Sequence, residues 1–143
     1  VRTSWLFSEY GSNFVKTMLR LAKERDSLSV VHDQTGCPTY AGDLAHAIIE
    51  LLQQPTSPRG IFHYCGNKSA TWYEFTKAIF QTAHHLDESF RIPELNAITT
   101  EQYPLPAPRP AYSIMDCSRL ETEFGIKPSD WQKALREILR KID

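Results

Sequence analysis

The sequence predicts a mixed α/β domain with short strands, several helices and one long loop. This pattern is more typical of a lid or substrate domain than of a self-sufficient sheet. In the stretch 30–49 an apolar β-branched run ends in a polar turn, and a helical pattern follows. Capping motifs mark further helices along the chain. The segment 87–111 contains five prolines and therefore predicts a loop.

In the first half of the chain, apolar runs and caps define the elements in order. Residues 1–7 read as a strand. Either Ser12 or Asn13 can cap a helix from Asn13 to about residue 25, because the side-chain oxygen of either can accept a first-turn amide hydrogen. The central strand is expected at about 29–33. The next helix is expected at about 42–54, where apolar residues recur at helical spacing.

The second half begins with a short strand at 61–65, followed by a capping box in which Thr71 and Glu74 open a helix that extends to about residue 84. Short strands are expected at 98–100 and 112–115.

Two helices complete the chain. One covers 118–124 and ends at Gly125, a typical left-handed terminator. A second capping box at 129–132 opens the last helix, which extends to about residue 141. Its apolar stripe consists of Trp131, Leu135, Ile138 and Leu139.

Composition narrows the class of protein. The 143 residues fit one domain with a sizeable core, and the net charge is −1 with scattered Lys and Arg, which argues against a nucleic-acid partner. No apolar run approaches the length that spans a bilayer, so no membrane association is expected. Cys37, Cys65 and Cys117 are too far apart in sequence for a metal cluster or a disulfide framework, which predicts a reducing cytoplasm.

The sequence contains no motif for catalysis by this chain alone. Its six glycines form no phosphate-binding loop of any standard spacing. Tyr73 and Lys77 match the Tyr-x-x-x-Lys pattern of short-chain dehydrogenases, but Tyr73 falls in the first turn of a capped helix, where an aromatic side chain usually packs against its neighbours. The histidines and carboxylates show no spacing that predicts a metal site. We therefore assign no catalytic residue and no metal ligand.

Three positions suggest a ligand site. The turn after the central strand lies at a strand's carboxyl end, where α/β proteins bind ligands, and Gly36 and Pro38 fix the directions of Gln34 and Thr39. An ordinary strand-to-helix connection explains this turn equally well. Arg109, held between prolines, suits phosphate oxygens.

Trp5 provides a second kind of candidate. Its ring at a strand end suits a sugar ring or a base, although a core position is an equal alternative.

Four ordered stretches carry a resemblance that covers essentially the whole chain. They are VRTSWLFSEYGSNFVKTMLRLAKE, VVHDQTGCPTYAGDLAHAI, GIFHYCGNKSATWYEFTKAI and RPAYSIMDCSRLETEFGI. In this order they resemble the C-terminal half of dTDP-4-dehydrorhamnose reductases, which are extended short-chain dehydrogenases. Arg2-Thr-Ser-Trp5 and the stretch Asp33–Thr39 are the most specific parts.

The resemblance implies that residues 1–143 are the sugar-nucleotide-binding half of a longer protein. A preceding Rossmann half would hold NADPH or NADH and the catalytic Tyr-x-x-x-Lys, so this chain alone should be inactive. The abrupt strand-like start at Val1 agrees with that expectation. The implied partners are the dTDP-sugar substrate and the Rossmann half. The implied reaction reduces the 4-keto group of dTDP-4-dehydro-L-rhamnose to dTDP-L-rhamnose.

The resemblance also implies roles for individual residues. Trp5 matches the tryptophan that packs on the sugar, and Arg109 matches the arginine that meets the diphosphate. The residues expected to line the nucleotide pocket or its rim are Asn13, Phe14, Gln34 and Thr39. The residues expected near the nicotinamide are Thr3 and Ser4.

The family also raises the question of a metal. Some relatives form a magnesium-bridged dimer through acidic residues, but Gly42 stands where one such acid is expected. Magnesium is therefore not placed on any residue, and a homodimer stays open.

Two other classes remain open. A non-catalytic regulatory subunit, such as the β subunit of methionine adenosyltransferase, shares the superfamily. A sugar-nucleotide epimerase or 4,6-dehydratase is the other alternative. The stretch Gln34–Thr39 argues against it, because those relatives have a pattern similar to Gln-x-Arg-Asp at the corresponding place. An α/β domain without a ligand is the remaining explanation.

Overall fold

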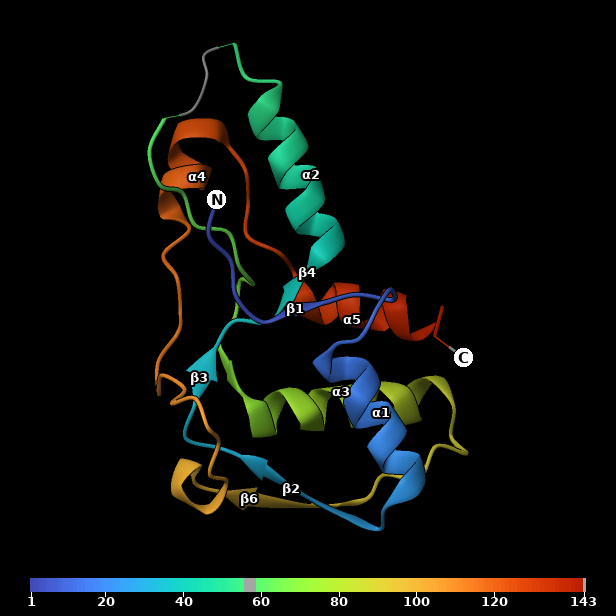
Figure 1. Cartoon of the computed structure of the whole chain (residues 1–143). Helices are drawn as coiled ribbons and strands as arrows, with labels where there is room; N and C mark the ends of the chain where they lie inside the picture. The colour runs from blue at the N-terminus through green and yellow to red at the C-terminus, as the bar shows by residue number, and fades with distance from the viewer. Residues whose placement is uncertain (56–58, 143) are drawn as a thin grey trace.

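The computed structural model describes residues 1–55 and 59–142 as an elongated molecule with helices in its middle (Figure 1). The upper end in Figure 1 contains two helices, α2 (Ala41–Leu52) and α4 (Ser118–Phe124). The middle contains α1 (Phe14–Glu24), α3 (Trp72–Leu86) and α5 (Trp131–Leu139). Every helix in these ranges is too short or too polar to cross a membrane.

The strands form three small ladders instead of one sheet. The longest ladder lies at the lower end in Figure 1 and joins β2 (Ser27–Val31) in parallel to β6 (Glu94–Ile98). A second parallel pair joins β1 (Leu6–Phe7) to β4 (Thr39–Tyr40). An antiparallel pair joins β3 (Thr35–Gly36) to β5 (Ala70–Thr71). Because ladders this short have little stability of their own, the helices that pack on them hold them in place.

Buried side chains form two main clusters that match the two parts of the molecule. The larger lies among α1, α3, α5 and β2, and Val15, Ile79, Phe80 and Leu135 are almost completely buried in it. The smaller lies between α2 and α4 and includes Leu51 and Leu120. The predicted stripe of the last helix is confirmed for Trp131, Leu135 and Ile138, which are buried, and Leu139 is partly buried.

The three cysteines meet in a third, small buried cluster, although they are distant in sequence. The Cys65 and Cys117 Sγ atoms lie 3.5 Å apart, and all three thiols are free. The hydrogen bond with the Cys65 thiol and burial raise the pKa of the Cys117 thiol. Buried free thiols of this kind pack as small apolar groups.

Several local predictions are confirmed. Asn13 caps α1 by accepting a hydrogen bond from the Lys16 amide at 3.2 Å. Gly125 ends α4 with a φ of 71°. The capping box of α3 is complete, because the Glu74 amide donates to Thr71 Oγ1 at 3.1 Å and the Thr71 amide donates to Glu74 Oε2 at 2.8 Å.

Other predictions are wrong, because long-range pairing decided the outcome. The strand expected at 98–100 is β6 at Glu94–Ile98, aligned along the whole of β2. The strands expected at 61–65 and 112–115 are single bridges, from His63 to Arg2 and from Tyr112 to Thr35.

The capping box predicted at 129–132 is also wrong. Asp130, not Ser129, caps α5 by accepting from the Lys133 amide. Ser129 Oγ instead donates to Asp43 Oδ2 at 2.6 Å, so it links α5 to the first turn of α2.

Replacing Thr71 by alanine should lower the free energy of unfolding by about 1 kcal/mol, because the first turn of α3 loses its capping oxygen. Thr82→Ala is the matched control, since the Thr82 hydroxyl only donates to the Ala78 carbonyl within the same helix. Urea denaturation measures both variants. Equal losses for the two would contradict a specific role for the cap.

Candidate functional site

A cavity of about 370 Å³ opens between α1, β2 and the proline-rich loop. Its walls are Phe14 and Met18 of α1, residues 29–31 of β2, and Gln34. Trp72 closes one side at the start of α3. The loop contributes Tyr103, Leu105 and Arg109. The cavity therefore combines an apolar and aromatic lining with one guanidinium group, which is a composition typical of ligand sites.

The aromatic wall is a continuous stack that extends from the cavity into the core. The Trp5 and Trp72 rings lie parallel, with centroids 3.5 Å apart and 8° between their planes. Phe14 packs on Trp72 with centroids 4.6 Å apart and reaches the buried Phe75 at 5.6 Å. Because core packing holds these rings, the wall presents a rigid surface on which a planar ring can stack.

Trp5 is placed by an unusual backbone and a close glycine. Its φ is 51°, in the left-handed region that non-glycine residues rarely adopt. A Cβ atom at Gly36 would lie 2.6 Å from Trp5 Nε1 and 2.8 Å from Ser113 Oγ, so only glycine leaves room for the indole. The glycine predicted from sequence to allow a tight turn therefore also seats Trp5.

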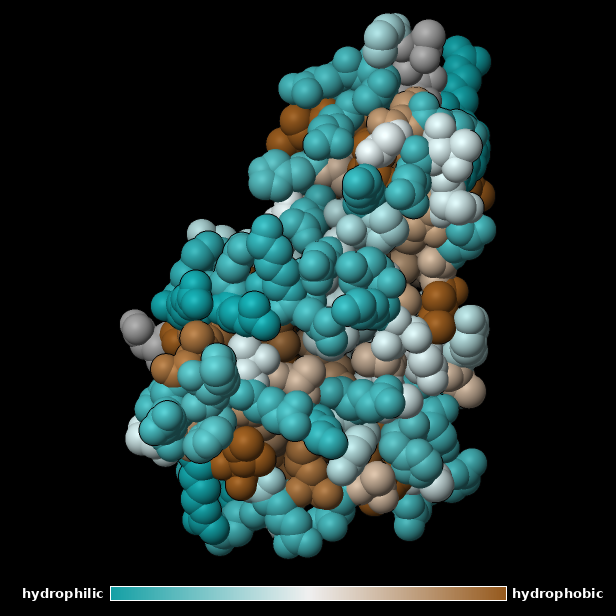
Figure 2. Space-filling model, turned by 180° about the vertical axis from the view of Figure 1, so that it is seen from behind, coloured by the Kyte–Doolittle hydropathy of each residue, from teal (hydrophilic) through white to brown (hydrophobic). Residues whose placement is uncertain are grey.

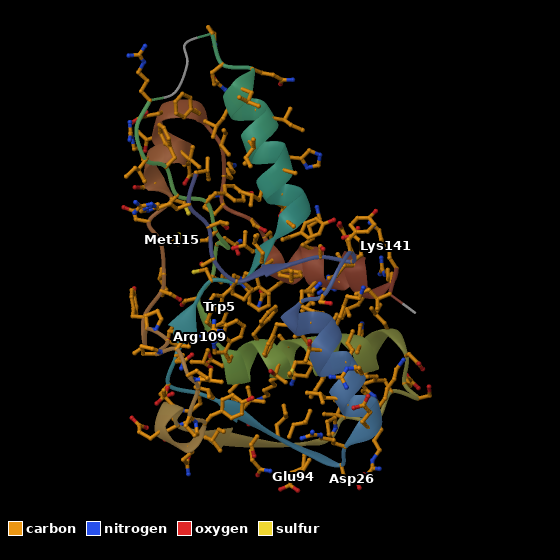
Figure 3. All side chains as sticks on the ribbon, viewed as in Figure 1. Trp5, Asp26, Glu94, Arg109, Met115 and Lys141 are labelled. Atoms are coloured by element: carbon orange, nitrogen blue, oxygen red, sulfur yellow. The ribbon has the colours of Figure 1, made fainter. Side chains whose placement is uncertain are left out.

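Arg109 is the one cationic side chain in the lining of this cavity. It forms no ion pair with the residues in 1–55 and 59–142, so its guanidinium is free to bind an anion. Figure 3 shows Arg109 and Trp5 at the same level of the molecule, between the α2 end and the β2–β6 ladder.

The other predicted residues have mixed positions. Phe14 and Gln34 line the cavity, as Arg109 does. Asn13 lies outside the lining and caps α1, and its Nδ2 donates to the Ser8 carbonyl at 2.7 Å. Thr39 is fully buried and donates to the Cys37 carbonyl, so it does not form the rim. Neither Asn13 nor Thr39 therefore lines the cavity.

Thr3 and Ser4 lie directly before Trp5. Their hydroxyl oxygens are buried and have no hydrogen-bond partner within the described residues. Since buried hydroxyl groups are normally paired, these two fit a polar group that is supplied from outside the chain.

Sequence reasoning did not assign to the site residues 29–31 of β2, nor the lining residues Met18, Trp72, Tyr103 and Leu105. Met18 is a buried apolar residue of α1, and nothing in the sequence distinguishes it from the other core residues. Trp72 follows the Thr71 cap as the first residue of α3. An aromatic residue at a first helical position belongs to no repeating pattern, so the sequence does not indicate that it faces a cavity. Tyr103 and Leu105 lie in the loop, where no sequence pattern predicts which way a side chain points.

A larger hollow of about 590 Å³ lies on another side of α1, between α1, the end of α3 and α5. We call it the outer groove. It is lined by partly buried apolar residues such as Leu19, Phe90 and Leu139, with Lys16 and Lys23 among its polar residues. Of the predicted ligand residues it contains Asn13 alone. The smaller cavity is therefore the candidate site.

Comparison with known proteins places this fold in a class. A crystal structure of UDP-glucuronic acid 4-epimerase from Bacillus cereus shares the fold, with a TM-score of 0.72 at 13% identity, over 98% of this chain and 44% of that one. A dTDP-glucose 4,6-dehydratase from Bacillus anthracis shares the fold as well, so the chain has the fold of a part of such sugar-nucleotide enzymes.

The family itself follows from a closer match. The model of the RmlD substrate binding domain matches residues 1–143, so the chain belongs to this family. It is 50% identical over 142 residues to dTDP-4-dehydrorhamnose reductase from Aggregatibacter actinomycetemcomitans, covering 96% of this chain and 48% of that protein. It is 40% identical to the dTDP-4-dehydrorhamnose reductase from Bacillus anthracis solved in complex with NADP, with a TM-score of 0.85 over 98% of this chain and 47% of that one. The chain spans about half the length of these relatives.

Gly36→Ala should displace Trp5 and break its stack on Trp72, at a cost of about 1–3 kcal/mol in the free energy of unfolding. Near-ultraviolet circular dichroism, which reports tryptophan packing, should change with it. Gly11→Ala is the control: a Cβ atom there meets no atom within 4 Å, so this variant tests alanine at a strained backbone position, with a φ of 63°, without any clash with Trp5. An unchanged tryptophan signal in Gly36→Ala would contradict the account.

Proposed function

We propose that this chain is the sugar-nucleotide-binding domain of a dTDP-4-dehydrorhamnose reductase. The single observation that carries the proposal is the cavity that joins an aromatic wall to the unpaired Arg109, in a chain of the RmlD substrate binding domain family. The reaction is the reduction of the 4-keto group of dTDP-4-dehydro-L-rhamnose to dTDP-L-rhamnose.

The lining divides into parts that suit the parts of a dTDP-sugar. Trp72, Phe14 and Leu105 form an apolar surface for the thymine ring, since planar bases stack on aromatic side chains. Arg109 binds the diphosphate by paired N–H···O bonds. Trp5 does not line the cavity, but it is only partly buried and stacks on the lining residue Trp72, so we assign it the contact with the sugar. These residues bind and orient the substrate, while the proton donor lies outside this chain.

The cofactor is NADPH or NADH, and the Bacillus anthracis relative in complex with NADP supports the phosphorylated form. When the cofactor is bound to the intact protein, its nicotinamide would supply the hydride that reduces the keto carbon. Thr3 and Ser4 fit this arrangement because their unpaired hydroxyl groups can bind a polar group of the cofactor. No group of three or more potential metal ligands occurs among the described residues, and the proposal needs no metal.

A dinucleotide-binding domain is the partner that the surface of α2 suits. Ala45, Ile48, Ile49 and Leu52 form an exposed apolar stripe at helical spacing, and Leu52 is 79% exposed. Figure 2 shows apolar surface at this upper end of the molecule.

A second feature is a short parallel pairing near the N-terminus. Arg2 pairs in parallel with His63, through bonds from the Arg2 amide to the Phe62 carbonyl and from the Tyr64 amide to the Arg2 carbonyl. Parallel strands are normally buried within larger sheets, so both features favour continuation by a further domain. We place the whole protein in the cytoplasm, where the free buried thiols remain reduced.

Turnover of the intact protein tests the function. With NADPH and dTDP-4-dehydro-L-rhamnose it should form dTDP-L-rhamnose, detected by mass spectrometry, and dTDP should inhibit it competitively. Binding of dTDP without turnover would indicate a regulatory subunit instead. Absence of dTDP binding would refute the proposal.

Arg109→Ala should weaken dTDP binding by about 1.5–3 kcal/mol, the usual scale for a charge-assisted hydrogen bond. Isothermal titration calorimetry gives the dissociation constant. The control is Arg91→Ala, which removes an exposed arginine that pairs with Asp26 outside the cavity. Equal affinities of Arg109→Ala and the wild type would exclude the diphosphate role.

Trp5→Ala should reduce the affinity for a dTDP-sugar more than the affinity for dTDP, because the lost contact is with the sugar. The ratio of the two dissociation constants, also from calorimetry, separates this from general damage. Similar losses for both ligands would mean that Trp5 acts only as a core residue behind Trp72.

A further inference from the structure

The part of the proline-rich loop that lines the cavity is residues 103–110, which we call the strap. Asp33 holds the segment at the N-terminal end of the strap. The Thr100 amide lies 3.0 Å from both carboxylate oxygens of Asp33, and Thr100 Oγ1 donates to Oδ1 at 2.8 Å. Gln34 Nε2 donates to the same hydroxyl at 3.1 Å. The short helix η1 (Thr100–Gln102), which leads into the strap, therefore begins at a fixed point.

Thr35, in the same turn as Asp33, holds the segment at the C-terminal end of the strap. The Thr35 amide donates to the Ala111 carbonyl at 2.8 Å, and the Ser113 amide donates to the Thr35 carbonyl at 2.9 Å. Both ends of the strap are thus fixed by three consecutive residues, Asp33 to Thr35.

Between these ends the strap has little support of its own. Its residues are all exposed, and none of its side chains forms a hydrogen bond with the described part of the chain. Prolines at 104, 106, 108 and 110 restrict the backbone, so its path depends mainly on where its ends are held. Tyr103, Leu105 and Arg109 reach the cavity along this path.

Asp33 itself does not line the cavity. A carboxylate in contact with a diphosphate would repel it, whereas here both carboxylate oxygens accept hydrogen bonds from Thr100. These bonds hold the pKa of the Asp33 carboxyl below its usual value. The group remains an anion that binds the loop and not the ligand.

We propose that Asp33 is a positioning residue for the nucleotide diphosphate, acting through Thr100 and the strap on Arg109. This inference rests on the proposed function. It also gives Gln34 a second role, as a cavity-lining residue that supports the same hydroxyl.

A double-mutant cycle on the intact protein tests the inference by calorimetry with dTDP. Asp33→Ala should weaken dTDP binding about tenfold, because Arg109 is no longer held in place. In the Arg109→Ala background the same change should cost less than about twofold, since the residue that it positions is gone. Asp33→Asn should restore part of the affinity, because its amide oxygen still accepts from the Thr100 amide. Thymidine, which lacks the diphosphate, should be affected less than dTDP.

Asp87→Ala is the matched control. Asp87 also accepts from a backbone amide and a hydroxyl, both of Ser89, at 2.9 and 2.7 Å, but it lies outside the cavity. Its loss should leave the affinity for dTDP unchanged.

The outcomes are distinct. Wild-type affinity in Asp33→Ala, or fully additive losses with Arg109→Ala, would overturn the inference while leaving the proposed function intact. If the wild type does not bind dTDP, the proposed function fails and the inference fails with it. Should Asp33→Ala not fold, Thr100→Val, which keeps the amide and removes the hydroxyl, must show the same non-additivity with Arg109→Ala or the inference is refuted.

Discussion

The turn from Asp33 to Gly36 is the constraint on which the rest of the cavity depends. Its side chains and backbone hold both ends of the strap, through Thr100 and through residues 111–113. Its last residues form β3, which pairs with β5 and so fixes the point where α3 begins. Gly36 also leaves the space that Trp5 occupies. One short segment therefore determines the relative positions of the aromatic wall and Arg109.

The second requirement is rigidity, which the core supplies. The stack of Trp5, Trp72 and Phe14 is continuous with the buried Phe75, which Trp131 of α5 contacts edge-on. A wall that is already packed loses little conformational entropy when a planar ring binds against it. The strap, by contrast, is tethered only at its ends. The site thus combines a rigid aromatic surface with a cationic loop that is held at its two ends.

What could be predicted from the sequence followed from local chemistry. The caps at Asn13 and Thr71 and the stop at Gly125 depend on residues within one turn, so their positions were correct. Strand β6 lies in a segment read as loop, because its pairing with β2 is a contact between distant parts of the chain. Ser129 resembled a cap in sequence, but its hydroxyl donates a hydrogen bond to Asp43, which is far away in the chain.

The same distinction applies to the candidate site. Phe14, Gln34 and Arg109 were identified through a resemblance and do line one cavity. The direction of a side chain in the strap, as at Tyr103 and Leu105, depends on tethers that only the fold reveals. Trp72 was missed for a related reason, since its partner Trp5 is distant in sequence. Asn13 and Thr39 were expected at the site, but the first caps α1 and the second is buried, so neither lines the cavity.

The most direct test of the account is a crystal structure of the intact protein with dTDP bound. The account predicts the thymine ring against Trp72 and Phe14, and the diphosphate within hydrogen-bond distance of the Arg109 guanidinium. Nucleotide bound instead in the outer groove between α1 and α5, or away from Arg109, would contradict it.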